Sequence, residues 1–142
     1  MSKSNAFETD ILELFFNGTA LADLAENDGS SPATNLYVSL HTSDPGETGS
    51  QTTNETSYTS YARVAVARTS GGWTVSSGAV VPAATISFPA CTGSTATITH
   101  FGVGTAASGT GYLMYSGTVT PNISVSSGVT PQLSTSTSIS ED

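Results

Sequence analysis

The stretch THFGVGTAASGTGYLMYSGTVTPNISVSSGVTPQL, residues 99–133, contains no Lys, Arg, Asp or Glu and is crowded with Gly, Ser, Thr, Val and Tyr. Its short runs of alternating apolar and polar residues are typical of strands with one buried face. Gly, Pro and Asn between the runs indicate turns. The stretch therefore predicts paired β-strands. Its lack of charge suits closely packed strands or a subunit interface, because burying an unpaired charge is costly.

The same alternation extends over most of the chain. Further strands are predicted in LYVSLH (36–41), YARVAVART (61–69), ATISFP (84–89) and TATITHFGVGT (95–105), and GGWTVSSGAVV (71–81) predicts two short strands or a hairpin around Ser76-Ser77-Gly78. GYLMYSGTV (111–119) and NISVSSGVTPQLSTSTSI (122–139) complete a set of about eight strands at short spacing, which indicates a β-sandwich, jelly roll or small barrel. We expect a mainly β fold, a β-sandwich or jelly roll, with one short helical segment.

That helical segment is predicted near the N-terminus. Apolar residues recur there at helical spacing, at Phe7, Ile11, Leu14 and Phe15. Asn5 followed by Glu8 resembles a capping box, Asn17-Gly18 provides a stop, and Thr19 can begin a further short turn through Leu24. We expect residues 1–28 to pack on the domain or on a partner, and residues 29–142 to form the β-domain.

TSDPGETGSQTTNETS, residues 42–57, is a polar stretch of sixteen residues without a large apolar side chain. It is too long for a hairpin turn and predicts a protruding loop, with Asp44, Glu47 and Glu55 as its exposed acids. A calcium site would need more carboxylates than Asp44 and Glu47 supply. Asp-Pro-Gly favours a turn instead, in which Asp44 bonds its own backbone.

Composition restricts the partners. The 142 residues carry a formal net charge of −8, and Lys3, Arg63 and Arg68 are the only cations besides the N-terminus. Binding to phosphates or to an anionic membrane needs clustered Lys and Arg, so we expect neither a nucleic acid nor a membrane partner. The sequence shows no signal-peptide core and no apolar run long enough for a membrane span, so synthesis in a cytoplasm is expected.

The groups that could carry chemistry are few and isolated in the sequence. His41 and His100 lie in no catalytic or metal-binding motif, and Cys91 lacks a neighbouring His, so structural roles are expected for all three. We expect neither an enzyme nor a bound cofactor or metal. Trp73, Tyr58 and Tyr61 could form a sugar-binding platform, but core or interface packing is favoured.

Five blocks in order, LYVSLHTSDPGETG, YARVAVARTSGGWTV, ISFPA, THFGVGTA and LMYSGTVTPNISVSSGVTPQL, make the chain similar to small virion proteins of tailed bacteriophages, often called tail fibre proteins. The resemblance covers about residues 7–133 and implies a phage structural protein made in the bacterial cytoplasm. In its small size and acidity the chain is also similar to capsid decoration, or cement, proteins, and we therefore predict a decoration protein that stabilises the shell from the outer head surface. A tail or tail-fibre component that binds the host surface is the alternative.

The resemblance implies protein partners. Decoration of the outer capsid surface would require contact with the major capsid protein, a fibre role would require contact with tail proteins, and a homo-oligomer is expected in either case. The candidate interface residues are the apolar residues of the helix and of the charge-free stretch: Phe7, Ile11, Phe15, Phe16, Tyr112, Met114 and Tyr115.

Overall fold

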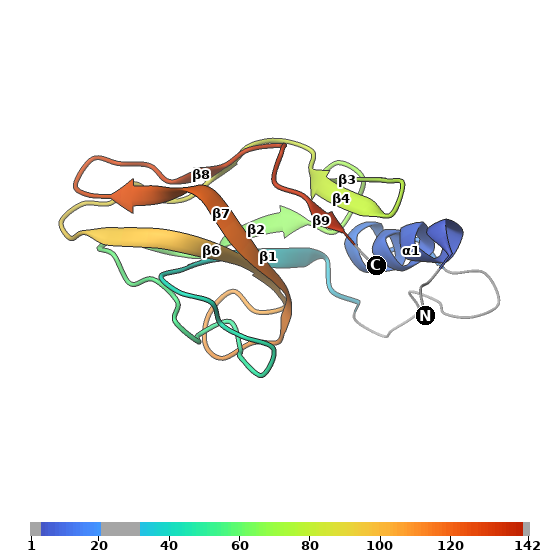
Figure 1. Cartoon of the computed structure of the whole chain (residues 1–142), viewed down its shortest axis with the longest axis horizontal. Coiled ribbons are helices and arrows are strands. Elements are labelled where there is room, and N and C mark those ends of the chain that lie inside the picture. The colour runs from blue at the N-terminus through green and yellow to red at the C-terminus, as the bar shows by residue number, and fades with distance from the viewer. Residues whose placement is uncertain (1–3, 21–31, 141–142) are drawn as a thin grey trace. The chain divides into compact units, whose positions relative to one another are not determined.

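The computed structural model describes residues 4–20 and 32–140 (Figure 1). The chain divides into two compact units. The helical unit contains Met1–Asn35, Val66–Thr85 and Leu133–Asp142, and the sheet unit contains Leu36–Ala65 and Ile86–Gln132. The strands β1, β2 and β8 each begin in one range and end in the other.

The helical unit begins with α1, Asn5–Leu12, which continues into a π-helical turn, η1, Glu13–Asn17. Ser4 caps α1, because its hydroxyl accepts a hydrogen bond from the Phe7 N–H at 3.4 Å, so the predicted cap at Asn5 is one residue late. The predicted stop is confirmed, since Gly18 ends η1 in the left-handed region with φ 69°. The short turn predicted through Leu24 extends beyond the described residues.

A hairpin forms the rest of the helical unit. The hairpin consists of two strands, β3 (Trp73–Ser76) and β4 (Ala79–Pro82). A short strand near the C-terminus, β9 (Ile139–Ser140), pairs with the start of β4. The two turn residues, Ser77 and Gly78, both have positive φ, as a type I′ hairpin requires. The predicted hairpin around Ser76-Ser77-Gly78 is therefore confirmed. The Gly78 N–H donates to the Thr9 hydroxyl at 3.0 Å, which fixes the turn against α1.

The sheet unit contains a four-stranded sheet in the order β2-β1-β6-β7 and a small pair, β5-β8. The strands are β1, Asn35–His41; β2, Val64–Ala67; β5, Ile86–Ser87; β6, Ala96–Gly104; β7, Leu113–Val125; and β8, Gln132–Leu133. β1 pairs antiparallel with β6 from Tyr37 opposite Gly104 to His41 opposite His100. The buried apolar residues of this unit include Leu36, Val38, Leu40, Ile98, Phe101 and Val103.

The strand predicted in residues 111–119 continues into the first residues of the predicted 122–139 strand as β7, Leu113–Val125, while the rest of that range contains β8 and the beginning of β9. β7 runs without interruption through Pro121, which follows a cis peptide bond. Its pairing with β6 shifts register there, from His100 opposite Thr118 to Ile98 opposite Ile123. Because β7 is an edge strand and the ladder is irregular at this point, the missing N–H of Pro121 is tolerated.

The predicted fold class is confirmed. The described residues form nine strands in three sheets and a single short helical segment at the N-terminus. Such an arrangement of separate small sheets is consistent with a sandwich. One detail differs from the simple alternation expected for β1: Val38, Ser39, Leu40 and His41 are all buried, so both faces of this strand are covered.

Candidate functional site

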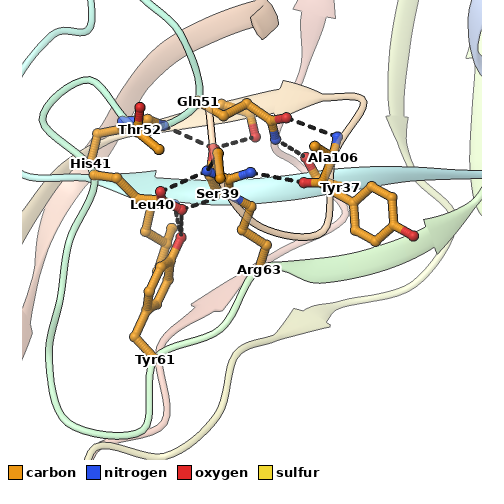
Figure 2. A network of polar contacts seen from close by, with 12 residues as sticks. Tyr37, Ser39, Leu40, His41, Gln51, Thr52, Tyr61, Arg63 and Ala106 are labelled. Atoms are coloured by element: carbon orange, nitrogen blue, oxygen red, sulfur yellow. Dashed lines mark hydrogen bonds and ion pairs between the residues drawn. The ribbon is translucent and has the colours of Figure 1, made fainter. Parts of the chain in front are cut away.

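The second face of β1 is covered by the 42–57 loop through a buried polar network (Figure 2). His41 is fully buried, and its Nδ1–H donates to the Thr53 carbonyl at 2.8 Å. Its Nε2 then accepts from the Ser39 hydroxyl, also at 2.8 Å. Burial lowers the pKa of His41, so the neutral ring is the favoured form. With both nitrogens occupied, His41 fixes the loop to the strand.

Gln51 joins three segments of the sheet unit (Figure 2). Its Nε2 donates to the Tyr37 carbonyl of β1 at 3.3 Å, and its Oε1 accepts from the Ala106 N–H at 2.9 Å. The Gln51 backbone N–H also donates to the Thr110 carbonyl at 3.0 Å. The side chain is fully buried and fills the space where a Cβ on Gly104 would lie. The 42–57 and 105–112 loops are thus held on the sheet together.

An ion pair fixes the far end of the 42–57 loop. The Arg63 side chain, 3% exposed, donates to both carboxylate oxygens of Glu55, through Nε at 2.7 Å and Nη2 at 2.8 Å. Arg63 Nη1 also donates to the Ala106 carbonyl at 2.9 Å, and Nη2 to the Gly109 carbonyl at 2.7 Å, both in the second loop. The side-chain hydrogen bonds to Glu55 raise the pKa of Arg63, so the guanidinium remains charged.

Tyr61 extends the same cluster. Its hydroxyl donates to Glu55 Oε1 at 2.8 Å and accepts from the Leu40 N–H at 3.0 Å. Burial raises the pKa of Tyr61 well above its ordinary value. The prediction of Glu55 as an exposed loop acid is therefore corrected: its side chain is 14% exposed, because the carboxylate faces Arg63 and Tyr61 rather than solvent.

The 42–57 loop and β7 line a hollow of about 320 Å³. Its lining consists of Gly46, Glu47, Gly49, Leu113, Met114, Tyr115 and Ser116. Asp44 is exposed nearby in sequence, and its Oδ1 accepts from the Gly46 N–H at 2.8 Å, which confirms the predicted turn. Tyr112, next to Leu113, is 71% exposed. Glu47, predicted as an exposed loop acid, therefore lies at the same hollow as the interface candidates Met114 and Tyr115.

The candidates on the helical segment divide into two groups. Phe7 and Phe15 are 39% and 42% exposed, and Ile11 is half-buried. Phe16, predicted as an interface residue, is instead fully buried within the helical unit. Its ring meets Trp73 edge-on, with 4.8 Å between the ring centroids. The π-helical turn places Phe16 rather than Phe15 toward the hairpin, and Phe16 is therefore a core residue.

Two members of the possible sugar-binding platform have the packing role that was favoured for them. Trp73 and Tyr58 are buried, and the Tyr58 hydroxyl donates to the Pro89 carbonyl at 2.8 Å. Burial raises the pKa of Tyr58 to about 12. Cys91 is buried as expected, with its thiol on the Ser94 carbonyl. His100 is half-buried and bonds the hydroxyl of Thr99.

Within residues 4–20 and 32–140, no group of three or more His, Cys, Asp or Glu residues is placed to hold a metal ion. No helix in the same ranges is long and apolar enough to cross a membrane. The network fixes two long loops in one conformation, and fixed loops can bind a partner with little loss of conformational entropy.

The sequence alone did not predict the roles of Gln51 and Arg63. Arg63 could have been found, because it is one of few cations in the chain and lies among small apolar residues.

Comparison with known proteins gives the class to which the chain belongs. Residues 2–139 match the family described as Podophage GP4 fiber I protein gp80, and the chain belongs to this family. It is therefore a structural protein of a phage virion, as the sequence resemblance predicted. A search of curated proteins gave no match.

Proposed function

We propose that the protein is a component of the fibre apparatus of a tailed phage and acts by binding neighbouring virion proteins. The family match over almost the whole chain, to a protein described as a podophage fibre, carries this proposal. The partners would be tail proteins and further copies of the chain. The exposed surface around the hollow would provide contacts, because the network that supports it holds the loops in place.

A non-enzymatic role is part of the proposal. The groups best suited to catalysis are engaged in holding the fold: His41 bonds Ser39 and Thr53, and Glu55 is paired with Arg63. A general acid or base has to reach a substrate proton. His41 is fully buried, and its two ring nitrogens are both bonded within the chain, which favours a structural role.

Decoration of the outer head surface is the second candidate. The net charge of −8 favours it, because an acidic protein is repelled by packaged DNA and is suited to the outside of the shell. In that case the major capsid protein would be the partner. The fibre assignment is preferred because it agrees with the description of the family.

Gold-labelled antibodies raised against the purified chain test the assignment on intact virions by electron microscopy. We expect label at the tail, and none once the antibody is pre-absorbed with the purified chain. Label spread over the whole head would replace the fibre assignment with decoration. Virions without specific label would contradict both candidates.

A further inference from the structure

The hollow between the 42–57 loop and β7 combines a charged side with a largely apolar one. Its loop side contains Glu47, which is exposed. Its strand side consists of Leu113, Met114, Tyr115 and Ser116. The first three of these are half-buried, so a group that enters the hollow covers apolar surface. A volume of about 320 Å³ is at the lower end of the range of about 300–1,000 Å³ for ligand pockets, so the hollow suits a compact group such as one side chain.

The charge of Glu47 is not balanced from within the chain. Its carboxylate has no hydrogen bond or ion pair in the part of the chain that the structure describes. The two Arg residues described there are engaged elsewhere: Arg63 pairs with Glu55, and Arg68 donates to two carbonyls of η1. A second copy of the chain, with its net charge of −8, is repelled by an acidic wall. The complementary group is therefore a cation of a different molecule.

The backbone that carries Glu47 is held in a fixed turn. The Gly49 N–H donates to the Gly46 carbonyl at 3.1 Å, which closes a turn around Glu47. Gly46 has a φ of 70°, in the region that favours glycine. Asp44 supports the turn from one side, because its Oδ1 accepts from the Gly46 N–H and its carbonyl accepts from Asn54 Nδ2, both at 2.8 Å. A partner therefore meets a loop whose backbone is already ordered, which lowers the entropic cost of binding.

We propose that the hollow receives a basic side chain of a neighbouring virion protein, and that Arg fits it best. Lys and Arg lay an apolar stem along apolar surface, here Leu113 and Met114, while the charged head bonds a carboxylate, here that of Glu47. Arg is favoured over Lys because its guanidinium can bond a carboxylate through two donors and can stack on an aromatic ring such as that of Tyr115. This inference rests on the proposed function and deepens it by naming the chemistry of the partner.

Titration of Nα-acetyl-arginine amide into the purified full chain, followed by two-dimensional proton–nitrogen NMR, tests the hollow. We expect saturable shifts of the Gly46, Glu47 and Gly49 amide signals, with a millimolar Kd. Nα-acetyl-citrulline amide has nearly the same shape and no charge, and it is expected to bind about fivefold more weakly, as the loss of one exposed ion pair predicts.

Two variants assign the preference for the charged probe to one carboxylate. Glu47→Gln is expected to bind the two probes equally. Asp44→Asn is the matched control, because it removes one negative charge from the same loop and its amide oxygen can still accept from the Gly46 N–H. It is expected to keep the wild-type preference. Equal binding of the two probes by the wild type, or the same loss of preference in both variants, would overturn the proposal.

Photo-cross-linking in virions identifies the source of the basic side chain. Thr48 follows Glu47 and is exposed, and p-benzoylphenylalanine is incorporated in its place. After irradiation, mass spectrometry is expected to find a cross-linked segment of another virion protein that contains Arg or Lys. A cross-link to a second copy of the chain, a segment without a basic residue, or the absence of a cross-link would overturn the proposal. Such a result would leave the fibre assignment intact, because antibody labelling of the virion tests that assignment separately.

Discussion

Replacing Gln51 with Ala tests whether the polar network holds the two loops on the sheet. The substitution removes the acceptor of the Ala106 N–H and the donor to the Tyr37 carbonyl, and it empties a fully buried site. A buried backbone group without a partner costs about 1–3 kcal/mol. Ala106 and Tyr37 are only half-buried, so water can reach them in part. We therefore expect Gln51→Ala to lower the free energy of unfolding by about 2–4 kcal/mol.

Urea unfolding at neutral pH, followed by far-UV circular dichroism, measures this loss. Hydrogen exchange should show a parallel loss of protection in residues 42–57 and 105–112, since Gln51 joins these segments. Thr52→Ala is the matched control, because Thr52 is exposed and its hydroxyl bonds that of Ser50, another surface hydroxyl, so a change within about 0.5 kcal/mol is expected. A Gln51→Ala variant that matches this control in both measurements would refute the role assigned to the network.

Three further predictions concern the core and the buried charges. Burial lowers the pKa of His41 from its ordinary 6.5, so the unfolded chain binds the proton more readily, and stability falls as pH decreases below about 6.5, by at most about 1.4 kcal/mol per pH unit. Urea titrations from neutral to mildly acidic pH should show this contribution in the wild type and not in His41→Asn; equal slopes for the two proteins would disprove it. Arg63→Met removes the cation paired with the Glu55 carboxylate and should lower the free energy of unfolding by about 3–5 kcal/mol, with a smaller loss for Arg63→Lys. An Arg63→Met variant as stable as the wild type would show that the ion pair is dispensable. Phe16→Ala should lower the free energy of unfolding by about 3–5 kcal/mol and change the fluorescence of Trp73, which its ring contacts. Phe15→Ala should change the free energy of unfolding by no more than about 0.5 kcal/mol. Similar losses for the two variants would contradict the assignment of Phe16, and not Phe15, to the core.

Local patterns predicted much of the fold. The β3–β4 hairpin and the stop at Gly18 follow from residues adjacent in sequence, which restrict the backbone directly. The alternation in LYVSLH correctly predicted β1 and the burial of Leu36, Val38 and Leu40. The continuity of β7 was missed because Pro121 resembles a strand boundary, and an irregular ladder at an edge is visible only in the pairing with β6.

The candidate surface was predictable only in part. Glu47, Met114 and Tyr115 were chosen from two distant segments, and their meeting at the hollow depends on tertiary structure. The burial of Ser39 and His41 depends on a loop folding over the strand, and alternation alone assigns those residues to the solvent face. Glu55 reads as an ordinary loop acid until Arg63 is placed beside it.

The number of copies in each virion tests the fibre assignment most directly. Isotope-labelled reference peptides can give the ratio of this protein to the major capsid protein in purified particles by mass spectrometry. Digestion with chymotrypsin is preferable, because Lys3, Arg63 and Arg68 are the only sites for trypsin. A fibre component is expected at a small fraction of the major capsid protein. A number of copies comparable with that of the major capsid protein would contradict the fibre assignment and favour decoration of the head.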